Sequence, residues 1–294
     1  MAALPRRLYE EGFAGWDISY AGILTDCMIL VVGLLCAGLV YRSYKDTWSS
    51  IEVLSASFVM FAALEGVGYG CGGAAHYMLA GYHQDGGVMS KEWGVGNWQW
   101  MMPWTVAMVL TPIAAALGFS TALTYGGVGV NCSRISKAIG VVVSIWELVM
   151  CIVSVDKSGT VATFWALLTS TLSMCVIFRN RAESLSLCLQ ATGYVSRIVG
   201  YGVLMTAPPS CKGMDVVAIE TQTGTFFRKA ESSCLYPKEF NQNAIFHVFI
   251  ALSLVLIFIS IDMKLTKDRE AAYASMLTRS YQNAGSNTRC CGIV

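Results

Sequence analysis

Long apolar segments separated by short polar connections make up most of the chain. Each segment is close to or above the roughly 20 residues that a helix needs to cross a bilayer. The lipid core offers no hydrogen-bond partner to a bare backbone, so each segment is predicted to be an α-helix. The predicted fold is all-α, a seven-transmembrane helix bundle over residues 20–263, with an outer N-terminal segment 1–19 and a tail 264–294. The seven predicted helices cover residues 20–41, 51–80, 98–125, 135–155, 160–178, 185–206 and 242–263.

The connection over residues 207–241 is the one long loop between predicted spans. Its stretch 216–227 has alternating β-branched and aromatic residues around a Thr-Gly pair, which predicts two short strands. Cys211 and Cys234 bracket these strands. On an oxidising side of the membrane they are predicted to form a disulfide, worth about 3 kcal/mol, and two free thiols are the alternative.

Lysine and arginine are more frequent in one set of connections than in the other. This bias predicts that the N-terminus lies outside and the C-terminus in the cytosol, because cytosolic loops of membrane proteins are enriched in these residues. The tryptophans near residue 98 fit an interfacial belt on the outer side. The sequon at Asn131 falls in a predicted cytosolic loop and is expected to stay unglycosylated. The predicted cytosolic cations are Arg42, Lys45, Arg134, Lys137, Arg179, Arg181, Lys264, Lys267, Arg269, Arg279 and Arg289.

Composition agrees with a membrane protein. The chain is 55% hydrophobic and 13% charged, whereas soluble domains carry about 25% charged residues. The net charge of +1 gives no basic surface for nucleic acid. The stretch behind Arg6 and Arg7 has no apolar core, so the first span is expected to target the chain to the membrane.

The chain ends in Cys290-Cys291-Gly-Ile-Val. The last four residues match the C-a-a-X prenylation pattern loosely, and the neighbouring Cys290 is a candidate for palmitoylation. We therefore predict a lipid-modified cytosolic tail, with an unmodified tail as the alternative.

Ionisable residues inside the spans are the candidate functional groups. A charge near the bilayer centre costs roughly 2.5–3.5 kcal/mol on insertion scales, so each one needs a partner or a role. Glu65 and His76 lie at helical spacing on one face of a glycine-rich segment, 64–76. Counting residues along each span places Asp26, His76, Asn243 and His247 in one layer of the outer half, Arg197 somewhat deeper, and Glu65 and Glu147 near mid-membrane.

Two interpretations of these groups remain open. In the first they only hold the bundle together: Arg197 pairs with Glu147 or Glu65, and the histidines bond to Asn243 and Asp26. In the second they line a cavity, where two histidines and a carboxylate can hold a metal such as zinc. His76, His247 and Asp26 are then the metal ligands, Glu65 carries protons, and Asn243 orients the ligand.

The positions of these groups resemble those in the superfamily of seven-span alkaline ceramidases and progestin and adipoQ receptors. Asp26 corresponds to an acidic or amide residue near the first span, His76 to a histidine in the second span, and His247 to one histidine of an H-x-x-x-H motif in the last. Gly72 stands where the superfamily has a serine, and Asn243 stands where it has the other histidine of that motif. The superfamily's aspartate in the third span has no counterpart in Trp98-Gln-Trp-Met-Met-Pro103. The resemblance implies zinc-dependent amide hydrolysis of a lipid, or lipid binding without hydrolysis.

The function predicted first is therefore a lipid-binding or metal-dependent, hydrolase-like membrane protein whose partner is a membrane lipid. A receptor-like or scaffold protein with a lipid-modified tail is the second prediction, although the sequence has no D-R-Y at the end of the third span and no N-P-x-x-Y at the end of the last. A transporter or channel is the third, because glycine interrupts only one span and unwound transporter helices usually come in pairs.

Overall fold

The computed structural model describes residues 20–45, 50–84, 98–128, 130–153, 158–179, 184–206, 216–221, 224–229 and 242–287. Within these ranges the chain is helical apart from one pair of strands. The helices are α2 (Tyr20–Tyr44), α3 (Ser50–Gln84), α4 (Trp98–Tyr125), α5 (Val130–Val153), α6 (Thr160–Arg179), α7 (Leu185–Thr206) and α8 (Gln242–Asn287). The predicted all-α fold of the helical bundle is therefore confirmed over these ranges.

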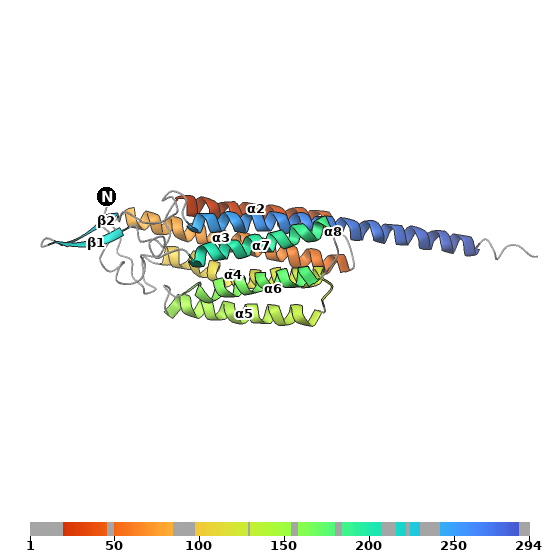
Figure 1. Cartoon of the computed structure of the whole chain (residues 1–294), viewed down its shortest axis with the longest axis horizontal. Helices are drawn as coiled ribbons and strands as arrows, with labels where there is room; N and C mark the ends of the chain where they lie inside the picture. The colour runs from red at the N-terminus through yellow and green to blue at the C-terminus, as the bar shows by residue number, and fades with distance from the viewer. Residues whose placement is uncertain are drawn as a thin grey trace, which may run out of the picture.

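The helices run side by side along one axis (Figure 1). Their contacts follow the order α2, α3, α4, α6, α7, α8 and back to α2, so six helices close into a ring. α5 packs on the outside of this ring, chiefly against α4, and lies at the edge of the bundle in Figure 1. The ring is filled by aromatic and branched side chains, among them Phe58, Phe61, Ile250 and Leu254, none of which is exposed.

Glycine lets α2 and α3 approach each other closely. A Cβ atom at Gly33 would lie 2.6 Å from the carbonyl oxygen of Ala62 and 2.9 Å from the Cα of Gly66. Both neighbours are backbone atoms, which cannot move aside without moving a helix. This contact is the small-residue packing that membrane helices use in the absence of a hydrophobic driving force.

Among the helices that the structure describes, six are long and apolar enough to cross a membrane: α2, α3, α4, α5, α6 and α8. α7 has 22 residues but is less apolar, because a series of its polar residues, including Gln190 and Arg197, is buried inside the bundle. Its backbone nevertheless runs parallel to its neighbours through the bundle (Figure 1).

The predicted strands in the long loop are present. β1 (Val216–Thr221) pairs antiparallel with β2 (Gly224–Lys229), in a register that places Val216 opposite Lys229 and Thr221 opposite Gly224. Cys211 and Cys234 lie outside the described residues, so their disulfide stays a prediction. The same holds for lipidation at Cys290 and Cys291 and for the segment 1–19.

α8 continues far beyond the last predicted span. It is a single helix from Gln242 to Asn287, and its C-terminal part projects out of the bundle (Figure 1). The span and the first part of the tail, which the sequence divides at residue 263, are therefore one continuous element.

Candidate functional site

An ion pair between α3 and α7 lies inside the ring. Arg197 Nη1 donates to Glu65 Oε2 at 2.7 Å and Nη2 to Glu65 Oε1 at 2.6 Å, so the pair is bidentate. Both side chains are buried, with 3% and 4% of their surface exposed. The guanidinium also lies 5.3 Å from the centre of the Phe61 ring, and its Nε contacts Ser170 Oγ at 3.4 Å. Of the two carboxylates predicted from the sequence, Glu65 is thus the partner of Arg197.

Glu147 has a different role. Its carboxylate accepts hydrogen bonds from the backbone N–H groups of Gly159, at 2.6 Å, and Ala162, at 2.7 Å. Gly159 directly precedes α6 and Ala162 lies in its first turn, where the N–H groups have no partner within the helix. Glu147 therefore caps α6 from the neighbouring α5, and of the two alternative partners predicted for Arg197 the structure shows Glu65. The negative charge also complements the positive end of the α6 dipole.

Asp26 and His247 come together from α2 and α8. His247 Nε2 lies 3.3 Å from Asp26 Oδ1, and its Nδ1 lies 3.0 Å from Thr25 Oγ1. All three residues are buried. The ring of Tyr69, from α3, meets the imidazole edge-to-face with centroids 5.4 Å apart. The pairing of His247 with Asp26 expected in the first interpretation is present, and the sequence analysis did not identify Thr25, which directly precedes Asp26.

The glycine-rich face of α3 lies against Asp26. A Cβ at Gly73 would lie 2.8 Å from the Asp26 Cβ, so only glycine allows this approach. A Cβ at Gly72 would meet only the two carboxylate oxygens of Asp26, each at 3.9 Å. The Asp26 carboxylate therefore faces a position on α3 that has no side chain, one turn before His76.

His76 itself is buried and contacts α4. Its ring meets that of Trp104 edge-to-face with centroids 5.9 Å apart, and Trp104 Nε1 donates to Ser158 Oγ at 2.8 Å. Asn243 is half-buried on α8, one turn before His247. Asp26 and His247 are thus the two predicted metal ligands that the structure brings into contact. In the part of the chain that is described, no three His, Cys, Asp or Glu side chains come close enough to hold a metal ion.

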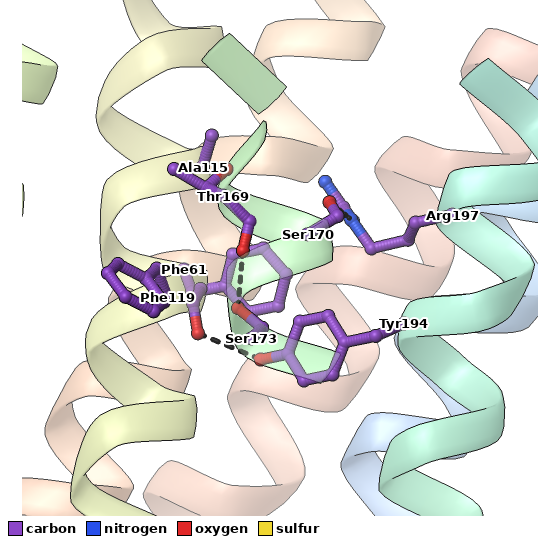
Figure 2. A pocket seen from close by; sticks show the side chains of 9 residues that line it. Phe61, Ala115, Phe119, Thr169, Ser170, Ser173, Tyr194 and Arg197 are labelled. Carbon is purple, nitrogen blue, oxygen red and sulfur yellow. Dashed lines mark hydrogen bonds between the residues drawn. The ribbon is translucent and has the colours of Figure 1, made fainter. Parts of the chain in front are cut away.

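A narrow crevice lies beside Arg197, lined mainly by side chains of α4 and α6 (Figure 2). It is too narrow to admit a water molecule. Tyr194, at one side of the crevice, donates to the carbonyl oxygen of Gly118 at 2.8 Å. The lining residues come from α3, α4, α6 and α7: Phe61, Ala115, Gly118, Phe119, Thr169, Ser170, Ser173, Tyr194 and Arg197.

Apolar helices that enclose paired ionisable groups define a multi-pass integral membrane protein. Comparison with family models, with curated proteins and with solved structures finds no match to this chain. Its function is therefore inferred from the site.

Proposed function

We propose that α7 is a seventh span, with the N-terminus outside and the C-terminus in the cytosol. With 22 residues, α7 is about 33 Å long at 1.5 Å per residue, enough for a hydrocarbon core of about 30 Å. Its polar side chains are buried, whereas Val195 and Val199 on its other face are 40% and 43% exposed, as expected of residues in contact with lipid. The excess of lysine and arginine in one set of connections supports the orientation.

Within this seven-span arrangement, we propose that the protein binds the polar group of a membrane lipid between α2, α3 and α8. The observation that carries the proposal is the Asp26 carboxylate, buried beside His247 and facing the bare backbone of Gly72. A polar cluster at this depth is expensive unless it pairs or binds something. The Asp26 carboxylate presents acceptor oxygens there, and its cluster with Thr25 and His247 includes no permanent positive charge. A lipid whose polar group donates hydrogen bonds suits this set better than an anionic one.

A hydrolase version of this function would need zinc or another metal. A catalytic zinc site takes three protein ligands and leaves a fourth position open. Asp26 and His247 would supply two ligands, but both ring nitrogens of His247 already face protein groups, and His76 lies against Trp104. The described arrangement does not complete a metal site, so the proposal rests on lipid binding. Glu65 is fully engaged with Arg197, so its role as a proton carrier in hydrolysis, like that of Asn243 in orienting a ligand, stays a prediction.

Gly72 provides a matched test of lipid binding. In Gly72→Leu the new side chain would fill the position over Asp26 and is expected to lower the amount of co-purifying lipid at least tenfold, whereas Gly72→Ala, whose Cβ fits at 3.9 Å, should retain it. The measurement is mass spectrometry of lipids extracted from purified protein, with Asp26→Asn as a second variant. Equal lipid content in all four proteins would overturn the proposal. Metal analysis of the same samples, with His76→Ala and His247→Ala added, tests zinc separately.

A further inference from the structure

A stripe of polar side chains follows α7 through the inside of the bundle. Its members are spaced by four, four, three and four positions, which places them on one helix face. None is more than 3% exposed. From one end to the other they cover about 22 Å at 1.5 Å per residue, most of the hydrocarbon thickness. They are Ser186, Gln190, Tyr194, Arg197 and Tyr201.

Neighbouring helices extend this stripe at both ends. At the end nearer the predicted cytosolic side, Ser186 Oγ lies 2.5 Å from the hydroxyl of Tyr125 on α4 and donates to the carbonyl oxygen of Ser260 on α8 at 2.9 Å. At the outer end, the hydroxyl of Tyr201 lies near Tyr69 on α3 but has no hydrogen-bond partner among the described residues. Polar groups of α3, α4 and α8 therefore continue the α7 stripe in both directions.

Two fully buried groups on the inner part of this stripe have no hydrogen-bond partner among the described residues. They are the side-chain amide of Gln190, at both its nitrogen and its oxygen, and the hydroxyl of Ser253 on α8. Ser253 lies against α7, because its carbonyl oxygen would be 3.2 Å from a Cβ at Gly193. An unsatisfied buried polar group costs about 1–3 kcal/mol. Groups of this kind in protein interiors usually bond to an ordered water or another bound group.

We propose that the α7 stripe is a proton path across the membrane, gated by the Glu65–Arg197 ion pair. Close packing argues for the proton over larger species, since the crevice beside Arg197 admits no water-sized sphere and the guanidinium repels metal cations. A proton needs no pore. In such a relay each hydroxyl or water takes up a proton from one neighbour, releases its own to the next and then turns back, so it is chemically unchanged after transfer. The Tyr194 hydroxyl, which donates to the carbonyl oxygen of Gly118, has to turn away from that oxygen to take part. Water admitted transiently at Gln190 and Ser253 completes the chain where no hydroxyl bridges it.

The ion pair is the barrier in this path. Glu65 on α3 faces Arg197 on α7, and the Phe61 ring lies against the guanidinium. Tyr69 and Tyr201 lie one helical turn further out on the same two helices. The Asp26–His247 pair lies beyond Tyr69. Both oxygens of Glu65 accept from Arg197, so a proton can be taken up only when the bidentate pair opens. The positive charge of Arg197 then opposes the added proton, and transfer is expected to be slow and driven by membrane voltage.

Proton flux into vesicles tests the path. The full-length protein is reconstituted into liposomes with an internal pH-sensitive dye, and a potassium diffusion potential, negative inside, is imposed with valinomycin. The wild type is expected to acidify the lumen several-fold faster than protein-free liposomes. Glu65→Asp, which shortens the carboxylate and weakens the bidentate contact, should raise the rate further. Gln190→Leu should lower it to the protein-free level, whereas Thr192→Val, at an exposed position of the same helix, should keep the wild-type rate.

A wild-type rate equal to that of protein-free liposomes would overturn the proposal, as would a Gln190→Leu rate equal to wild type. Gln190→Leu is used only if it elutes as a monodisperse species and unfolds near the wild-type temperature. If it does not fold, Ser253→Ala, which removes a single unpartnered oxygen, takes its place with the same expected loss of flux. The proton path can be tested independently of lipid binding, because neither Gln190 nor Ser253 contacts the Asp26–His247 pair.

Discussion

Single polar side chains in this bundle depend on the partners that the other helices provide. Arg197 is held by both oxygens of Glu65, and His247 by Thr25 and Asp26. In a medium of low dielectric constant, removing one member of such a pair leaves the other charged and buried, which costs more than removing both.

The Glu65–Arg197 pair gives a prediction at this scale. Arg197→Met should lower the free energy of unfolding by about 3–5 kcal/mol, because it leaves the Glu65 carboxylate buried without its counter-charge. The double variant Glu65→Leu/Arg197→Met removes both charges and should be more stable than either single variant. Unfolding in mixed micelles with a denaturing detergent measures all four proteins. If the two single effects simply add in the double variant, the pair contributes no coupling and the prediction is wrong.

Except for the C-terminal end of α8, the helices were predictable to within a few residues, because the length of each apolar segment is set by the bilayer. The start and end of segments 98–125 and 185–206 agree with α4 and α7. α5 begins at Val130, earlier than the predicted residue 135, since a helix can extend through polar residues beyond the lipid.

The contacts of the buried polar groups were less predictable. Counting residues gives the depth of a side chain but not the neighbouring helix that it meets. Glu65 and His76 share a face of α3 by spacing, yet Glu65 meets Arg197 on α7 and His76 meets Trp104 on α4. Glu147 likewise turned out to meet the start of α6. Which helices become neighbours depends on how the six helices are arranged around the ring, and a single sequence does not show that order.

The contact between α2 and α3 gives a prediction at the scale of elements. Gly33→Ala should destabilise the protein by about 1–3 kcal/mol, the usual cost of overpacking, because the added methyl would lie 2.6 Å from the Ala62 carbonyl oxygen. Gly38 on the same helix has no atom within 4 Å of an added Cβ. Gly38→Ala should therefore be neutral, or stabilising by up to about 1 kcal/mol through helix propensity. Thermal unfolding compares the two variants, and equal effects would contradict the predicted contact.

The cap on α6 gives a second prediction for an element. Glu147→Gln keeps the shape of the side chain but replaces one acceptor oxygen with an NH₂ group that faces the backbone N–H groups of α6. A loss of about 1–3 kcal/mol is expected, the cost of leaving a buried donor unsatisfied. Glu270→Gln on the exposed side of α8 is the control and should change stability little. An equally small effect at both positions would show that the cap does not stabilise α6.

For the molecule as a whole, the number of spans decides on which side of the membrane each part lies. Of the described helices, the six that are long and apolar enough to span would place both termini on the same side, whereas a seventh span places them on opposite sides. α7 is the helix in question. The polar side chains of α7 lower its mean hydropathy, but they point into the bundle and not toward lipid. The low hydropathy of α7 is therefore weak evidence against its being a span. Both proposals require α7 to cross, because the path runs along it and the lipid site depends on the ring that it closes.

The positions of the termini can be tested with glycosylation acceptors. A short acceptor tag at the N-terminus should be glycosylated in microsomes, and the same tag at the C-terminus should not, because lysine and arginine favour a cytosolic tail. Asn131, in its native sequon, is expected to stay unmodified in both fusions. Gel mobility before and after glycosidase treatment measures each site. Glycans on both tags or on neither would mean an even number of spans and would remove α7 from the membrane. A glycan on the C-terminal tag alone would keep seven spans but reverse the orientation, and the end of the path at Ser186 would then face outside.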